Sequence, residues 1–506
     1  MYLPVLVAAA VLYALTAQRG VSWQDSGMFQ YRVLHGDWGF DGELGLALAH
    51  PLYILAGRIF AALPVWMTPM RLSIFSGLGM AVALANLAMA GTILTGKRRV
   101  GAAIVAMLAL AHTPWWLATI AEVYTWSLAG FTAELWILLL LLRRPTWGKL
   151  AGLALVSGLG LSVHNFALLP LPVYVVTAVV LIARKRLPAW SILVAAGAYL
   201  AGSGLYVAMI VAKAVELGSV GEAVRSALVG RYQAQVFGGD PSAGRAKANF
   251  ALVALNFANV LLPLALVGLW CLRRRAGAAA WVLYALAAIQ TVFAVRYFVP
   301  DQFTFFLPTY AMMAVLAAVG LDVLVSSGPG WRRLAWAGVA ASIVAMPVLY
   351  TVAPAVAMKV APSAVRHPRA LPYRDEARYW ITPCKQNEDS AQRFATEVLR
   401  QAPPDAVIVA DPTAYYPLAV LQQTSRTGRG ILLLGGHEPW PIPRPGEDIN
   451  AFFEAVGRRP LYVVSPQKGY CPGALLEAAT FHKEGLLYRA VRIESPPFSP
   501  GPGPAR

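Results

Sequence analysis

Long apolar runs separated by short polar turns dominate the first 354 residues. A helix that spans a bilayer needs roughly 20 apolar residues. By that length the pattern predicts about eleven spans, near residues 2–17, 72–95, 100–117, 118–142, 149–165, 166–183, 189–213, 250–271, 278–296, 303–324 and 334–354. The first run is short and lacks the basic flank of a signal peptide, so we expect an uncleaved first helix.

Two long polar segments, about 18–71 and 214–249, interrupt these runs on one side of the predicted bilayer. Within the first, residues 44–63 are apolar enough to form an amphipathic helix lying in the membrane interface. Long loops on a membrane domain are where binding residues tend to lie.

The periodicity shortens after residue 360, where proline and charge increase. Short apolar runs predict strands at 405–410, 430–434 and 461–464, and helices at 415–423 and 450–456. We therefore expect a membrane domain over 1–358, a small α/β domain over 359–494, and a disordered Pro/Gly-rich tail over 495–506.

Composition supports this division. The chain is 58% hydrophobic and only 13% charged, whereas soluble domains are about a quarter charged. These figures exclude disorder, a coiled coil and a disulfide scaffold. They predict an α-helical polytopic membrane protein with a smaller water-soluble part.

The net charge of +17 comes mostly from short basic clusters between apolar runs. The first 359 residues contain 25 basic and 11 acidic residues, and 14 of the basic ones lie in five clusters, at 97–99, 143–149, 184–186, 273–275 and 332–333. This is the positive-inside pattern and not a nucleic-acid-binding face. It predicts a multi-pass plasma (inner) membrane protein with a cytoplasmic N-terminus and an extracytoplasmic C-terminal domain.

Acidic residues show the opposite asymmetry. Nine of the eleven that precede residue 360 map to the predicted outer side or its rim. This distribution favours chemistry on the outer face, although it would also arise if acids simply avoided the inner loops.

The three cysteines and the glycine-rich segments indicate no common cofactor site. Cys384 and Cys471 both lie in the predicted outer domain and could form a disulfide, while Cys271 lies at an inner helix end. The sequence contains no Cys-x-x-Cys, no phosphate-binding Walker loop and no dinucleotide-binding fingerprint. A nucleotide-driven pump is therefore not expected, and no metal site is predicted.

Asp25 is the leading catalytic candidate because it follows directly on the first span, at the outer rim. An ionised carboxylate there could accept a proton from an incoming hydroxyl group. The alternative is a turn or helix-cap residue, since Asp-Ser-Gly is ordinary turn chemistry.

Further polar residues are predicted on the same side. His50 precedes a proline at a helix start, with Tyr53 one turn later, and Glu122 with Tyr124 opens the fourth span. Alternatively, His50 is merely exposed, and Glu122 is tolerated by the helix dipole.

His164 and Asn165 lie at the turn between the fifth and sixth spans, where they could simply satisfy backbone groups. Arg231, Arg296 and Asp301 lie at outer positions. Arginine can bind a phosphate-bearing ligand in a bidentate fashion. The alternatives are an interfacial anchor, or an ion pair between Arg296 and Asp301.

The order of these motifs resembles a known family. Asp-Ser-Gly at 25–27 is followed by His-Pro at 50–51, Ala-Glu-Val-Tyr at 121–124, Gly-Leu-Ser-Val-His-Asn at 160–165, and Asp301 before Leu-Pro-Thr-Tyr at 307–310. The pattern is similar to that of the GT-C superfamily of membrane glycosyltransferases, in the branch that includes a eukaryotic protein O-mannosyltransferase and many uncharacterised bacterial membrane proteins. The resemblance covers most of residues 1–435.

This resemblance implies a sugar, mannose among the candidates, transferred from a polyprenyl phosphate to a hydroxyl acceptor on the outer face. The acceptor would be a protein Ser/Thr, a lipid or an envelope glycan. The family's transfer reaction usually inverts the anomeric carbon of the sugar. Asp25 occupies the place of the family's catalytic acid, and the matched positions His50, Glu122, His164, Asn165 and Asp301 would line the same cavity. A divalent metal is compatible with the family and is not required by it. Two departures are Met28, where a second acid is common, and a shortened His-Pro segment.

Two other classes of function are compatible with the composition. A transporter or flippase would favour mid-membrane charges and inverted repeats, but only Glu134 lies well inside a predicted span and no repeat is evident. A scaffold or sensor would use the outer domain to bind a partner. Neither alternative explains the ordered motifs.

Overall fold

The computed structural model describes residues 1–39, 45–232, 234, 243–299, 301–360, 362, 369–435 and 449–493. The chain divides into two compact units. One comprises residues 1–20, 32–370 and 375–388, and is called the membrane unit below. The other comprises residues 21–31, 371–374 and 389–506, and is called the α/β unit. The predicted tail at 495–506 lies outside the described residues.

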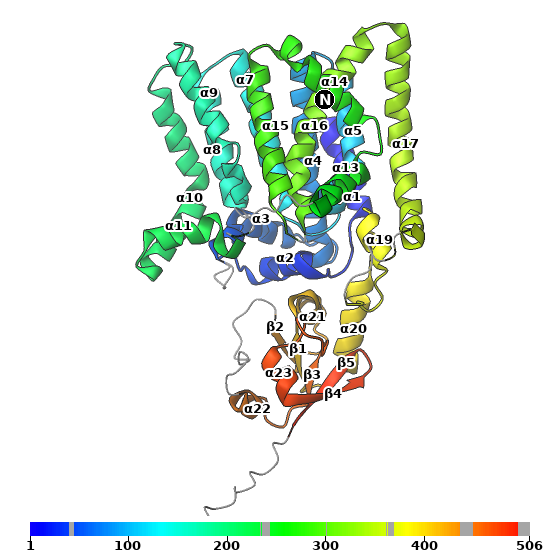
Figure 1. Cartoon of the computed structure of the whole chain (residues 1–506). Helices are drawn as coiled ribbons and strands as arrows, with labels where there is room; N and C mark the ends of the chain where they lie inside the picture. The colour runs from blue at the N-terminus through cyan, green and yellow to red at the C-terminus, as the bar shows by residue number, and fades with distance from the viewer. Residues whose placement is uncertain are drawn as a thin grey trace, which may run out of the picture. The chain divides into compact units, whose positions relative to one another are not determined.

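The membrane unit is a bundle of helices joined mostly by short turns (Figure 1). Its longer helices are α1 (Tyr2–Thr16), α4 (Thr68–Thr95), α5 (Arg98–Ala109), α6 (His112–Ala118), α7 (Tyr124–Arg143), α8 (Trp147–Val163), α9 (Leu171–Ala183), α10 (Ser191–Leu217), α13 (Ala243–Asn256), α14 (Leu261–Ala276), α15 (Ala279–Arg296), α16 (Leu307–Ser326) and α17 (Pro329–Val360), followed by the short α19 (Glu376–Ile381).

Among the described residues, seven helices are long and apolar enough to cross a membrane, or nine if each of two bent pairs counts as one span. The bent pairs are α5 with α6 and α13 with α14. The helices α1 and α8 are apolar but shorter. The predicted α-helical membrane fold is confirmed. The predicted count of eleven spans is not confirmed. Hydropathy identifies an apolar run, but it does not reveal a bend in the run or how many of its residues form one helix.

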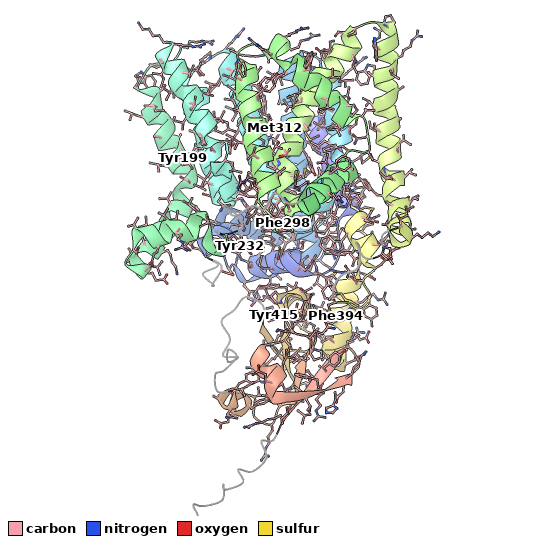
Figure 2. All side chains as sticks on the ribbon, in the orientation of Figure 1. Tyr199, Tyr232, Phe298, Met312, Phe394 and Tyr415 are labelled. Atoms are coloured by element: carbon pink, nitrogen blue, oxygen red, sulfur yellow. The ribbon has the colours of Figure 1, made fainter. Side chains whose placement is uncertain are left out.

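Close contact between helices depends on glycine where backbones meet. Gly268 of α14 and Gly320 of α16 lie so close to the facing helix that an added Cβ would overlap the carbonyl oxygens of Leu316 and Leu264, respectively. Small residues allow such approach where lipid supplies no hydrophobic driving force between helices. Met312, on the same helix as Gly320, is buried inside the bundle (Figure 2).

The two long polar segments form short helices. The first contains α2 (Gln24–His35), η1 (Leu46–Leu48) and α3 (Pro51–Ala61), and the second contains α11 (Val220–Leu228) and η3 (Gly230–Tyr232). In α3 one face is buried, including Tyr53 and Ile54, while Ile59 is 76% exposed. This is the amphipathic pattern predicted for 44–63.

The α/β unit contains a five-stranded sheet in the order β2-β1-β3-β5-β4. Strands β1 (Val407–Ala410), β2 (Leu432–Gly435) and β3 (Leu461–Val463) are parallel, while β4 (Ala479–Glu484) and β5 (Leu487–Arg492) form an antiparallel hairpin. The helices are α20 (Ser390–Gln401), α21 (Pro412–Ser425), α22 (Asn450–Val456) and α23 (Gly473–Ala478).

The three predicted strands and two predicted helices of this unit are confirmed, but the hairpin was not predicted. β4 is an edge strand and most of its residues are exposed. It therefore lacks the continuous apolar run that identifies the buried strand β1, whose four residues are all buried.

The compact units differ from the predicted boundary at 358–359 because residues 21–31 pack with the C-terminal chain. Trp23 is buried, donates a hydrogen bond from Nε1 to Ser390 Oγ at 2.8 Å, and lies 5.0 Å from the Phe394 ring. All three cysteines are free. The disulfide considered for Cys384 and Cys471 is therefore absent, and Cys471 is instead packed into the core of the sheet.

Candidate active site

Two of the predicted histidines are stacked in the membrane unit. His50 is the N-cap of α3 with φ 51°, and His164 is the residue directly after α8. Their rings lie 4.8 Å apart at an interplanar angle of 24°. Both side chains are buried. The left-handed backbone before Pro51 therefore directs the His50 ring onto a partner more than one hundred residues away in sequence.

Hydrogen bonds orient both rings. Nδ1 of His50 lies 3.0 Å from the carbonyl oxygen of Val163, which requires the proton on that nitrogen. Nδ1 of His164 accepts the backbone N–H of Phe166 at 3.1 Å, which leaves its proton on Nε2. Asn165 donates from Nδ2 to the carbonyl oxygen of Leu228 at 3.1 Å, joining this turn to α11. Both His164 and Asn165 therefore form hydrogen bonds with backbone groups, as the alternative interpretation of this turn expected.

Glu122 and Tyr124, in the segment at 121–124, make separate contacts near the histidine pair. Glu122 is buried, and its backbone N–H donates to Ser76 Oγ at 2.8 Å, while that hydroxyl lies 3.4 Å from the Tyr53 hydroxyl. The Tyr124 hydroxyl donates to Asp301 Oδ2 at 3.3 Å, and its ring lies 5.4 Å from that of His164. The sequence motifs are therefore brought together from four separate parts of the chain.

A cavity of about 190 Å³ opens beside these residues. Its walls include Tyr124, His164 and Asn165, together with Tyr232, Tyr297 and Phe305. Figure 2 shows Tyr232 toward the end of the bundle that carries α3 and α11. Aromatic walls with a few convergent polar groups are typical of ligand sites.

Burial sets the charge state of the polar groups. It lowers the pKa of His164 to about 3, and it lowers the pKa of His50 well below its usual value, with His164 and Arg32 adding to the shift. Burial also raises the pKa of Asp301. At neutral pH both imidazoles are therefore uncharged, with Nε2 of His50 a hydrogen-bond acceptor and the Nε2–H of His164 a donor.

Arg32, which the sequence motifs did not single out, contacts the backbone that directly precedes His50. It is 1% exposed. Its guanidinium donates to the carbonyl oxygens of Leu48 and Ala49, at 2.9 and 2.6 Å, and lies 3.5 Å from the carboxylate of Asp37. Because Ala49 directly precedes His50, Arg32 holds the backbone at the start of α3.

Neither His50, Tyr53, Glu122 and Asp301 nor Asp25 and Arg296 are among the described residues that line this cavity. Asp25 is exposed in the first turn of α2 and belongs to the α/β unit. Arg296 is exposed at the end of α15, and no ion pair joins it to Asp301 in the described part of the chain. Arg231 lies in η3, and its side chain is outside the description.

Two tyrosines that the sequence analysis did not select line the cavity. Tyr232 and Tyr297 directly follow Arg231 and Arg296. The aromatic pair Tyr297 and Phe298 after Arg296 was an available signal, since aromatic residues flanking a span often mark a site as well as the interface. Arg32 had no comparable signal, because the two carbonyl oxygens that it holds belong to residues whose side chains give no sign of the contact.

The neutral histidine pair predicts a pH-dependent stability. Unfolded histidine takes up a proton near pH 6.5, whereas folded His164 does so only near pH 3. Stability is therefore fully present above pH 6.5 and falls as the pH is lowered toward 3, by up to about 1.4 kcal/mol per pH unit for each histidine. We expect His164→Gln to flatten the decrease in Tm measured in detergent between pH 7 and 5.

The exposed His482 of β4 provides the control. His482→Gln should leave the pH dependence of Tm as in the wild type. Equal steepness in wild type and His164→Gln would show that the buried pair does not contribute.

The fold is shared with a membrane protein of known structure. The crystal structure of ArnT from Cupriavidus metallidurans bound to undecaprenyl phosphate matches with a TM-score of 0.56 at 13% identity, over 97% of this chain and 97% of that chain. The apo state of the same protein matches with a TM-score of 0.55 at 13% identity, over 96% of this chain and 97% of that chain. No protein-family profile and no curated protein sequence matches the chain.

The membrane fold expected from the sequence is confirmed as the fold of ArnT, and at 13% identity this likeness shows the fold alone. The O-mannosyltransferase branch is not distinguished by this match. The apolar helices and the shared fold indicate an integral membrane protein.

Proposed function

We propose that the protein is a membrane glycosyltransferase that uses a sugar linked to a polyprenyl phosphate. The proposal is supported by the match to ArnT, which is bound to undecaprenyl phosphate in its crystal structure. The observation that carries it is the convergence of the 50, 122–124, 164–165 and 301 segments beside one aromatic cavity. These are the segments that carry the sequence resemblance to the GT-C superfamily.

The transferred group would be a hexose such as mannose, and the acceptor a hydroxyl group of a protein Ser/Thr, a lipid or an envelope glycan. The acceptor oxygen attacks the anomeric carbon and forms the new glycosidic bond. The bond from that carbon to the phosphate oxygen breaks, and the phosphate leaves with the electron pair. Attack opposite the leaving group inverts the anomeric carbon.

Asp25 is the proposed general base that takes the acceptor proton. Carboxylates suit this role because the phosphate is already a good leaving group, so only the nucleophile needs activation. The product polyprenyl phosphate carries more negative charge than the donor. Arg231 or Arg296 is proposed to stabilise it, as preorganised cations stabilise charge that develops in a transition state.

A divalent metal would be an additional source of such stabilisation. Among the described residues, no group of three or more His, Cys, Asp or Glu side chains is arranged to bind a metal. Single carboxylates such as Asp301 could still contact a metal together with the substrate phosphate. The proposed reaction is therefore to be measured both with and without a divalent metal.

The positive-inside pattern supports placing the chemistry on the outer face of the plasma (inner) membrane. The basic clusters would then be cytoplasmic, as would the N-terminus, and the α/β unit would be extracytoplasmic. His50, as an acceptor at Nε2, and His164, as a donor from Nε2, would bind sugar hydroxyls together with the tyrosines of the cavity, whose hydroxyls can donate or accept.

The test is release of polyprenyl phosphate from labelled polyprenyl-phosphate hexoses by the purified, reconstituted chain, in the presence of membrane extract as acceptor. Val229 lines the cavity. Val229→Trp should reduce release at least tenfold, because an indole would occupy a cavity of about 190 Å³. Val215→Trp, at a position 79% exposed on α10, is the matched control and should retain activity.

Two results would contradict the proposal. Wild-type protein that releases no polyprenyl phosphate from any hexose donor would contradict the reaction itself. Full activity of Val229→Trp would show that the reaction takes place elsewhere.

A further inference from the structure

A second and larger cavity lies among the helix ends that carry the basic clusters. It has a volume of about 500 Å³ and is bounded by the last turns of α4, α7, α9 and α14 and by the first turns of α15. The hairpin turns α7–α8, α9–α10 and α14–α15 lie together at one end of the bundle (Figure 1). None of the described residues that line this cavity also lines the cavity of the candidate active site.

Four arginines and an apolar wall line this cavity. The arginines are Arg143, Arg184, Arg186 and Arg275, and no acidic residue is among the described residues that line it. The wall is mainly aliphatic and includes Leu139, Val176 and Val180. An apolar cavity with several cations is suited to a ligand that is part anion and part hydrocarbon.

Two of the four cations are already engaged by the protein. Arg275 lies 3.2 Å from the carboxylate of Asp322, which also pairs with Lys97 at 2.7 Å. Arg143 donates to the carbonyl oxygen of Ile93. These contacts stabilise the helix ends and reduce the charge that remains for a ligand.

Arg184 and Arg186 differ from those two. They flank the turn after α9, and no carboxylate pairs with either of them in the described part of the chain. Both are exposed. Guanidinium groups without a protein anion beside an apolar cavity are well placed to bind phosphate, which they contact in a bidentate fashion.

Tryptophans place this cavity at the level of lipid headgroups. Trp281 lines the cavity, is 61% exposed and lies 5.7 Å from the Arg273 guanidinium. Trp147 and Trp190, at the starts of α8 and α10, are also about half exposed, and their rings lie 5.7 Å apart. Tryptophan is enriched where hydrocarbon meets headgroups.

We propose that this cavity binds an anionic phospholipid of the adjacent leaflet, with its phosphate on Arg184 and Arg186 and its acyl chains along the aliphatic wall. A soluble phosphate would satisfy the arginines but would gain nothing from Val176, Val180 or Leu139. A neutral lipid would use the wall but leave the cations unpaired. By the positive-inside pattern this leaflet is the cytoplasmic one, opposite to the proposed glycosyl transfer.

The proposal is tested by native mass spectrometry of the full-length chain in detergent, titrated with phosphatidylglycerol. We expect one tightly retained lipid per chain. Arg184→Gln/Arg186→Gln should weaken its binding about thirtyfold, since each basic residue near an anionic lipid contributes about 1 kcal/mol, or about fivefold. Arg332→Gln/Arg333→Gln removes the same charge from exposed residues at the same end but outside this cavity, and should leave binding unchanged.

A second variant tests the cavity without changing its charge. Val180→Trp should fill part of the cavity beside its aliphatic wall and reduce lipid retention. Val348→Trp on α17, at a 57% exposed position, should leave lipid retention unchanged. Equal loss in both double-glutamine variants would indicate diffuse charge attraction and overturn the proposal. Equal binding of phosphatidylcholine, or of inorganic phosphate, would overturn it as well.

Discussion

Replacing Asp25 with asparagine should lower the rate of sugar transfer by about 10² to 10⁴, the usual contribution of a positioned general base. The change removes the proton acceptor and preserves the size of the side chain. Asp25 is exposed in the first turn of α2, where a carboxylate contributes only about 0.3–1 kcal/mol to helix stability. We therefore expect kcat to fall while Tm changes little, measured by product formation and thermal unfolding of the same preparation.

Glu222→Gln is the matched control for this change. Glu222 is exposed in the first turn of α11, so both variants replace a helix-start carboxylate with an amide. The control should retain transfer. If Asp25→Asn turned over normally, another group would have to be the base; if it lost activity together with Tm, the loss would reflect folding and not chemistry.

Replacing Arg32 with methionine should destabilise the membrane unit by about 3–5 kcal/mol, since each hydrogen bond to a charged group contributes about 1.5–3 kcal/mol. The change leaves the carbonyl oxygens of Leu48 and Ala49 without their guanidinium donor. It also frees the chain immediately before His50. We expect a large decrease in Tm, and a loss of transfer even below the new Tm because the histidine pair is no longer held in place.

Arg32→Lys separates charge from geometry. Lysine keeps the positive charge but cannot reach both carbonyl oxygens with a planar fork. We expect an intermediate Tm and partial transfer. The control Arg58→Met removes an exposed arginine from α3 and should have little effect. A fully stable and active Arg32→Met would refute the positioning role.

A buried carboxyl group bears on the alternative of a transporter. Glu134 of α7 is 1% exposed and accepts a hydrogen bond from Tyr174 of α9 at 2.9 Å. This contact joins two helices inside the bundle. Intramembrane carboxyl groups are often part of a transport path, but Oε2 of this one has a partner on a neighbouring helix, and a single such contact does not favour transport over glycosyl transfer.

Much of the architecture could be predicted because it depends on local properties of the chain. Each of the eleven apolar runs coincides with an apolar helix or a bent helix pair, since the cost of exposing backbone polar groups to lipid enforces helices there. The α3 helix followed from its apolar face and from Pro51 at its start. Strands β1, β2 and β3 followed from short buried runs bounded by turns.

The motifs also identified which segments converge, but not how they do so. Of the residues in these motifs, Tyr124, His164 and Asn165 line the cavity, while His50 and Asp301 contact His164 and Tyr124, respectively. The stacking of the two imidazoles was not predictable, because it depends on the left-handed backbone at position 50 and on the packing of α3 against α8.

By itself, the sequence determined the membrane helices, the basic clusters at their ends and the three parallel strands of the α/β unit, because hydropathy and charge act residue by residue. Only the tertiary structure decided the bends within α5–α6 and α13–α14, the association of Trp23 with Phe394, the burial of Arg32 against backbone carbonyls, and the cavity between the arginine-bearing helix ends. These features depend on contacts between residues far apart in the chain, and no local pattern of polarity encodes such distances.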